Sequence, residues 1–253
     1  MLPASNSTNI LPGNEMLQIN SYFASLDQAM YEDHVAFSEH TNPVRIGLHK
    51  SDTKLLAHVV LQYTLFSKRI VRFLEIARDS VRDWPPVIAE LDRNIAEETG
   101  SSTDGVSHYE LLRRGMLEDF GVSIDAVSPS RATAAFIKSA ELCLSNNDPA
   151  FAAGAVYGIE ATAPGEITVL RDVVNEYSVR LHGKALSHAS IVLFFLDAHI
   201  NDFEIGHRDG LQQALAPFLV ENNRSTFQEG FHAILYTMDT WWSELKHEAL
   251  SGS

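Results

Sequence analysis

Apolar residues recur every three or four positions along most of this sequence, and this spacing restricts the fold more than any other feature. It places the apolar side chains on one face of an α-helix, where they can pack against other helices. No run of four to eight β-branched residues lies between turn signals, so we expect almost no β-strand. The sequence therefore predicts an all-α fold, a single-domain helical bundle of about eight or nine helices. We expect these helices over residues 16–39, 52–79, 85–99, 108–120, 130–145, 148–163 with its continuation 166–181, 184–206, 209–219 and 221–248.

Capping and helix-breaking residues indicate where several of these helices begin and end. Ser51 or Asp52 is expected to cap the helix that follows, because either side chain can accept a hydrogen bond from a free backbone N–H group. Pro85 suits the first turn of a helix, and Gly100 is a residue type that commonly follows a last turn. Pro164 is expected to interrupt a helix, because proline breaks a helix interior.

The composition excludes several classes of function. The 253 residues include 19 lysines and arginines against 33 aspartates and glutamates, a net charge of −14. A surface this acidic repels phosphate backbones and anionic lipids, so we expect neither nucleic acid nor membrane as a partner. The single cysteine, Cys143, excludes an intramolecular disulfide and a cysteine-based metal site. Glycine-rich phosphate loops, the GxSxG serine motif and HExxH are all absent from the sequence.

The sequence also predicts where the protein resides and how it is divided. Its longest apolar stretch, Ile191–Leu196, is far shorter than the roughly 20 residues that a helix needs to cross a bilayer. No secretory signal pattern, linker or internal repeat is evident. We therefore expect a cytoplasmic protein with one domain over residues 16–250, preceded by a flexible tail over residues 1–15.

Carboxylates and histidines gather in three segments that otherwise have the pattern of buried helices. In the first segment, Glu98 ends one helix and His108 begins the next, so the loop between them can bring the two side chains together. In the second, Glu160 is the single acid among alanine, glycine and apolar residues. A buried carboxylate must be paired, protonated or bound to a metal, because burying it bare is costly. The alternatives are a solvated helix end at Glu98, and a pair with arginine or a solvent-facing position for Glu160.

The third segment contains His199, Glu204 and His207. Glu204 and His207 are three residues apart, so on a helix they share a face and can bind one ion. This carboxylate-x-x-His pair is the unit that carboxylate-bridged di-iron bundles use. The alternative is a polar helix end that emerges into solvent.

Together, the three segments can supply nitrogen and oxygen ligands to two divalent ions of iron or manganese, with open positions for O₂ and substrate. The predicted metal ligands are Glu98, His108, Glu160, His199, Glu204 and His207.

At these residues the chain resembles the haem-oxygenase-like di-metal oxidases and oxygenases, and within that group the CADD-like proteins. The family pattern is NLxxExG, a histidine that opens the next helix, a lone glutamate in a helix of small residues, and an aromatic-led HxxxDxxH. The matching segments here are Asn94–Gly100, His108, Glu160 and Phe194–His207. Related proteins are the UndA-type fatty-acid decarboxylases and, more distantly, the TenA-like proteins. The TenA-like thiaminases use an active cysteine, whereas Cys143 lies outside the three segments.

The resemblance implies a haem-oxygenase-like fold and an O₂-activating oxidase or oxygenase that binds two Fe(II) ions, or manganese. It also implies O₂ as co-substrate, a small organic substrate and an external reductant, and a homodimer is common among such folds. CADD-like members are thought to use a tyrosine of their own chain as raw material. The candidates for it are Tyr22, Tyr31, Tyr63, Tyr109 and Tyr157, and apolar walls are expected from Phe66, Phe73, Phe194 and Phe195.

Two features depart from the family pattern. Glu204 stands where the family has aspartate, so its carboxylate reaches one methylene further. His199 and Glu204 are five residues apart where the family has four. A π-helical turn would absorb the additional residue. Without one, His199 points about 100° away from its expected direction, and Asp202 becomes an alternative ligand.

Two other functions remain open at this point. One is a helical binding protein that has the same fold and no catalytic activity, which the displaced His199 favours. The other is an enzyme that holds a single metal ion in one half of the site.

Overall fold

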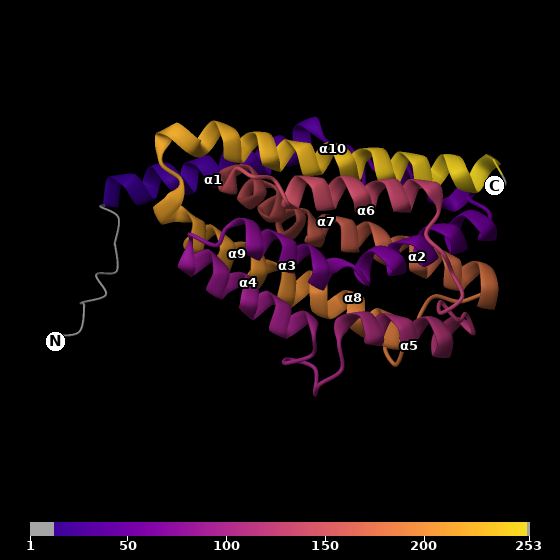
Figure 1. Cartoon of the computed structure of the whole chain (residues 1–253). Coiled ribbons are helices and arrows are strands. Elements are labelled where there is room, and N and C mark those ends of the chain that lie inside the picture. Colours follow the sequence, from indigo (N-terminus) through magenta and orange to yellow (C-terminus); the bar gives the residue numbers. More distant parts are fainter. Residues whose placement is uncertain (1–12, 252–253) are drawn as a thin grey trace.

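A computed structural model describes the backbone of residues 13–251 and their side chains, except those of residues 13–16 and 202. This part of the chain contains helices and no β-strand, which confirms the all-α prediction (Figure 1). The α-helices are α1 (Gly13–Asp33), α2 (Thr53–Ser67), α3 (Ile70–Ser80), α4 (Pro85–Glu98), α5 (His108–Phe120), α6 (Arg131–Leu144), α7 (Pro149–His182), α8 (Ile191–Ala198), α9 (Glu204–Leu215) and α10 (Glu221–Ser251).

Three short turns complete the described elements. The 3₁₀ turns are η1 (Arg45–Lys50) and η3 (Ala216–Phe218), and η2 (His199–Phe203) is a π-helical turn. Because η2 joins α8 to α9 without a break, the described residues form nine separate helical rods, within the predicted number. Residues 1–12 of the predicted tail lie outside the described residues, and α1 begins at Gly13.

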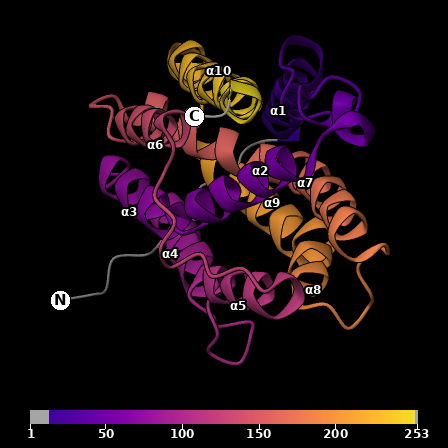
Figure 2. The same cartoon turned by 90° about the vertical axis from the view of Figure 1, so that its right-hand side faces the viewer.

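The helices form three layers, with α7 in the middle one. Seen from the side and from the end, α1, α6 and α10 lie on one side of the bundle, α4, α5 and α8 on the other, and α2, α7 and α9 between them (Figures 1 and 2). Most of α7 is buried, because helices pack against it from both outer layers. The side chains of residues 152–162 of α7 are therefore all buried.

Two glycines bring α7 and α10 into close contact. A Cβ atom on Gly154 would collide with the backbone carbonyl of Phe227, and one on Gly230 would collide with that of Phe151. The two helices run side by side in the same direction from there, so that Thr162 reaches Met238 about two turns further along α7. This contact holds the central helix against the outer layer.

Long-range hydrogen bonds end α1 earlier than the apolar pattern predicts. The helix was expected to reach residue 39 but ends at Asp33. Beyond it, the backbone N–H groups of Val35 and Ala36 donate to one carboxylate oxygen of Asp239 on α10, at 3.0 and 2.9 Å. The other oxygen of Asp239 bonds to the ring of His34 at 2.8 Å. These bonds replace the hydrogen bonds that a longer helix would make.

One segment predicted as a single helix, residues 52–79, is divided, and the helix predicted from residue 184 begins only at Ile191 and continues without the predicted break into α9. The chain turns between α2 and α3, so that α2 packs against α7 and α10 while α3 packs against α4. Asp52 is the residue that caps α2, because its side chain accepts from the N–H of Leu55. Residues 183–190 are not helical, since Gly183 ends α7 with a φ of +70° and Ser190 caps the start of α8.

Pro164 does not interrupt its helix, contrary to the prediction. α7 continues through it, although proline has no N–H group to donate to the carbonyl of Glu160 one turn earlier. Gly165 follows because a side chain there would contact the carbonyl of Phe37. Packing on all sides of α7 outweighs the lost hydrogen bond. Among the described residues, no helix combines the length and the apolar character that crossing a bilayer requires.

The close contact of α7 and α10 predicts opposite effects of glycine replacement at different sites. Gly154→Ala or Gly230→Ala should lower the free energy of unfolding by about 1–3 kcal/mol, because the methyl group forces the two backbones apart. Gly206→Ala is the matched control, since a methyl group there meets no atom within 4 Å. It should raise the stability by about 0.5–1 kcal/mol through helix propensity. Urea denaturation measures the free energy of unfolding of the three variants. A similar change in all three would contradict the close contact of α7 and α10.

Candidate metal centre

All six predicted metal ligands are buried, each with a relative exposure of 6% or less. This excludes the solvent-facing alternatives for their segments. The residues are Glu98 at the end of α4, His108 at the start of α5, Glu160 in α7, His199 in η2, and Glu204 and His207 in α9. They form two groups of three, in each of which one nitrogen or oxygen atom per residue lies within 4.8 Å of the others.

A tight loop folds His108 back onto Glu98. Gly100 has a φ of +111°, and a Cβ atom there would lie 2.7 Å from the carbonyl carbon of Gly105. Only glycine therefore fits this turn. Ser107 then caps α5 by accepting a hydrogen bond from the N–H of Glu110, which makes His108 the first residue of that helix.

The first group consists of Glu98, His108 and His199. The Nδ1 atom of His108 lies 3.1 Å from Oε1 of Glu98 and 3.0 Å from Nε2 of His199. The Nδ1 atom of His199 lies 2.7 Å from the backbone carbonyl of Phe195, so it carries the proton and leaves the lone pair of Nε2 directed into the group. Such an arrangement suits a metal-binding imidazole.

The second group consists of Glu160, Glu204 and His207. The Nδ1 atom of His207 lies 3.1 Å from Oε2 of Glu160 and 3.8 Å from Oε2 of Glu204. On the other side of the ring, Nε2 of His207 lies 2.9 Å from Oε2 of Glu97. The carboxylate of Glu97 thus holds the ring with Nδ1 facing the other two ligands.

Glu97 is a functional residue that the sequence did not reveal. It neighbours Glu98, and successive residues on a helix point about 100° apart, so only one of the two was expected to face the interior. Its other carboxylate oxygen accepts from Arg93 at 2.7 Å, which keeps it half-buried at the edge of the site. Two adjacent glutamates at a helix end were the only available signal.

The π-helical turn accounts for the unusual spacing between His199 and Glu204. η2 spans His199–Phe203 and contains the additional residue, as the resemblance required. His199 therefore faces the same interior as the ligands of α9. The side chain of Asp202, the alternative ligand, lies outside the described part of the structure.

Burial and neighbouring charges raise the pKa values of Glu204 and His207 in the second group. Burial raises the pKa of Glu204 well above its ordinary value, and the charge of Glu160 raises it further. Burial alone would lower the pKa of His207, but the charge and hydrogen bond of Glu160 outweigh this effect and raise it to about 10. In the absence of a metal ion, these groups therefore retain protons at neutral pH.

The pKa values of Glu98 and His199 in the first group are lowered. Burial lowers the pKa of His199 to about 4, so its ring is neutral. Burial would raise the pKa of Glu98, but the hydrogen bond and charge of His108 lower it. A neutral imidazole beside an ionised carboxylate is the state in which both groups bind metal.

The separations of the ligand atoms fit divalent metal ions. Two atoms that each lie about 2.1 Å from one ion and are 90° apart are separated by about 3.0 Å. Three of the separations, at 3.0–3.1 Å, agree with this value, whereas Nδ1 of His207 and Oε2 of Glu204 are 3.8 Å apart. Three carboxylates converge here, and no lysine or arginine is among the described residues that line the cavity between them. Imidazole and carboxylate together suit iron, manganese or zinc.

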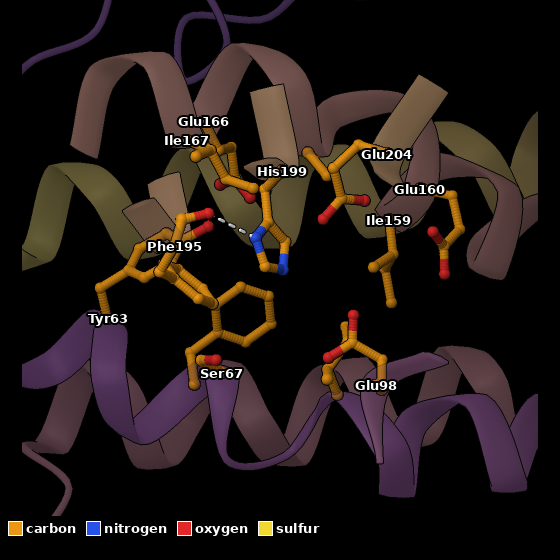
Figure 3. A pocket seen from close by; sticks show the side chains of 13 residues that line it. Tyr63, Ser67, Glu98, Ile159, Glu160, Glu166, Ile167, Phe195, His199 and Glu204 are labelled. Carbon is orange, nitrogen blue, oxygen red and sulfur yellow. Dashed lines mark hydrogen bonds between the residues drawn. The ribbon is translucent and has the colours of Figure 1, made fainter. Parts of the chain in front are cut away.

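A small cavity of about 40 Å³ lies beside both groups. Its lining includes four of the predicted ligands, namely Glu98, Glu160, His199 and Glu204. Tyr63 and Glu166 also line it, and they lie to the left of His199 in Figure 3. Of the four phenylalanines expected in its wall, Phe66 and Phe195 are present. Phe73 is buried elsewhere in the core, and the prediction for Phe194 is wrong, because 57% of its side chain is exposed.

One of the five candidate tyrosines lines this cavity, namely Tyr63. Tyr157 instead donates a hydrogen bond to Asp27, and Tyr22 donates one to the carbonyl of Arg224. Cys143 is not among the lining residues either.

The structure thus defines an all-α bundle in which two buried groups of histidine and glutamate face a single cavity. Residues 20–248 match the family described as a domain of unknown function with a solved structure, DUF3865. The chain belongs to this family. No protein with curated function matches it.

The fold is similar to that of a CADD-like protein of unknown function from Nostoc punctiforme PCC 73102. A crystal structure of that protein at 2.00 Å resolution has a TM-score of 0.84 and 34% sequence identity, and the match covers 92% of this chain and 99% of that one. A structure of the same protein at 1.35 Å resolution has a TM-score of 0.83 and 32% identity, and the match covers 94% of this chain and 98% of that one. These similarities support the CADD-like prediction.

The contact between Glu97 and His207 predicts a specific loss of metal affinity. Glu97→Ala should weaken Mn(II) binding about 10–100-fold, because His207 loses the carboxylate that orients its ring. Glu90→Ala is the matched control, since Glu90 pairs with the same Arg93 but not with His207. Competition with a chromophoric chelator measures both affinities. Equal affinities of wild type and the Glu97 variant would show that the contact has no such role.

The raised pKa of His207 predicts that metal affinity increases with pH. Below its pKa of about 10, His207 must lose a proton before Nδ1 can bind a metal ion. Each such proton raises the affinity about tenfold per pH unit. Mn(II) titrations between roughly pH 6.5 and 8.5 should therefore show the logarithm of the association constant rising with pH with a slope of at least one. A slope near zero would contradict the protonated state of His207.

Proposed function

We propose that this protein is a non-haem di-metal oxidoreductase that activates O₂ and oxidises a small organic substrate. The observation that carries the proposal is the pair of buried groups, each of histidine and glutamate, beside one cavity. The proposed metals are two Fe(II) ions, with manganese as the alternative at one or both positions. O₂ is the co-substrate, and an external reductant supplies electrons.

The chain's own residues provide the ligands and their orientation. Each group offers three protein ligands, which leaves open positions on an ion that prefers more. Bound divalent iron would supply the redox chemistry that amino-acid side chains lack. The carbonyl of Phe195 and the carboxylate of Glu97 fix the imidazoles of His199 and His207, so the ligands are held before any ion arrives.

The cavity walls limit access of water to the site. Phe66, Ile159 and Phe195 line the cavity together with the carboxylates, so the wall between the polar groups is apolar. An apolar wall favours an apolar substrate body over water and strengthens the electrostatic interactions inside.

The similarity to CADD-like proteins supports this proposal without adding a substrate, because those relatives are themselves described as proteins of unknown function. The resemblance of the ligand segments to haem-oxygenase-like di-metal oxidases supports the proposed chemistry. The π-helical turn in η2 removes the objection that His199 is displaced, which had favoured a binding protein without catalysis.

Metal content per chain tests the proposal directly. After anaerobic loading with Fe(II) and desalting, wild type should retain about two irons per chain, one for each ligand group. Glu160→Ala and His207→Ala should each lose most of this iron, whereas Glu110→Ala should keep it, since Glu110 pairs with Arg113 and Arg114 instead.

The other outcomes identify the other functions. One iron per chain would indicate a single-metal site, and no retained iron would leave a helical binding protein. If two irons are retained, O₂ consumption by the reduced protein should exceed that of both ligand variants.

A further inference from the structure

The cavity contains a fourth carboxyl group that neither ligand group uses. Glu166 lies on α7, six residues after Glu160 and therefore about 9 Å further along the helix axis. It lines the same cavity, and its side chain is only 1% exposed. In Figure 3 it lies to the left of His199, whereas Glu160 and Glu204 lie to the right.

One oxygen of this carboxyl group is held by the protein. The Nε1 atom of Trp242 donates to Oε1 of Glu166 at 2.6 Å. No second hydrogen bond and no ion pair joins Glu166 to another described side chain. The other oxygen therefore remains available to a molecule in the cavity.

The protein provides no cation to balance Glu166. Lysine and arginine are absent from the described residues that line the cavity. Burial raises the pKa of Glu166 to about 8, against the opposing effect of the hydrogen bond from Trp242. A cation that enters with a ligand would satisfy this carboxyl group, since a charge-assisted hydrogen bond is strong in an apolar site.

The rest of the cavity is suited to a short apolar body. Ile159 and Phe195 lie among its lining residues, and its volume of about 40 Å³ has room for only a few heavy atoms. A ligand with its charge at Glu166 extends along α7 toward Glu160. Its other end then lies near the two ligand groups.

We propose that this cavity binds a small primary amine as its ammonium ion, with Glu166 as the residue that recognises the charge. The inference rests on the proposed function for the role of the metal ions, but the ammonium site itself consists of residues that belong to neither ligand group. Glu166 would hold the amine end and present the apolar end to the metal centre.

Two other ligand classes fit the same residues less well. A ligand carboxylate would have to share the proton of Glu166, with no cationic side chain to balance the remaining negative charge. An alcohol can form a hydrogen bond with the free oxygen of Glu166 but brings no positive charge that would favour its ionised form. An amine alone supplies both the proton donors and the positive charge.

The test compares n-propylamine with propan-1-ol, which has the same size and no charge. Isothermal titration of the Mn(II)-loaded protein measures both dissociation constants for wild type and Glu166→Gln. Glutamine keeps an oxygen that can accept from Trp242 but removes the charge. The variant should bind propylamine at least about tenfold more weakly, while its affinity for propanol stays within about twofold.

Tyr63→Phe is the control within the same cavity, because it removes a polar group without removing a charge. It should retain the preference for the amine. Equal amine affinity in wild type and the Glu166 variant, or an equal loss for amine and alcohol, would overturn the inference.

The metal content of each sample separates this inference from the proposed function. Glu166→Gln should retain as much metal as wild type, because Glu166 is not a ligand. Failure of wild type to bind metal contradicts the proposed function. In that case, titration of the metal-free protein with propylamine tests the ammonium site, by the same comparison of wild type with Glu166→Gln.

Discussion

The structure depends on the burial of carboxylates in the centre of the bundle. Glu160 lies on a helix that other helices cover from both outer layers, so its charge cannot reach water. A buried charge is tolerated only with hydrogen bonds, a counter-charge or a metal ion. The end of α4, the start of α5, η2 and the first turn of α9 bring five histidine and glutamate side chains into the same interior as Glu160. The two groups that result could each hold a cation.

Local departures from regular helix geometry position the ligands. The π-helical turn directs His199 inward, and its Nδ1 bonds to the carbonyl of Phe195 in the preceding turn. Pro164 removes the donor for the carbonyl of Glu160 in α7. Such departures cost stability, and they commonly occur at functional sites. Here the tight contact between α7 and α10, through Gly154 and Gly230, holds the surrounding helices in place.

The cavity has two chemically different ends. At one end, carboxylates and imidazoles converge in two groups that could hold metal ions. At the other, Glu166 and Tyr63 are the polar groups of an otherwise apolar wall. This asymmetry fixes how a small molecule can be oriented, because a charged group and an apolar body cannot exchange places.

The sequence by itself determined the helical class, and its histidine and acid segments, with the resemblance that they carry, pointed to the six residues that come together in the core. Periodic apolar residues and isolated acids in apolar segments are local signals, and they are sufficient for that. Only the tertiary structure decided that α7 continues through Pro164 and that α1 ends at Asp33, because packing and the carboxylate of Asp239 outweigh local preference. For the same reason, neither Glu166 nor Glu97 was among the predicted site residues. Both acquire their roles from side chains more than 70 residues away, Trp242 and His207, which no local pattern can indicate.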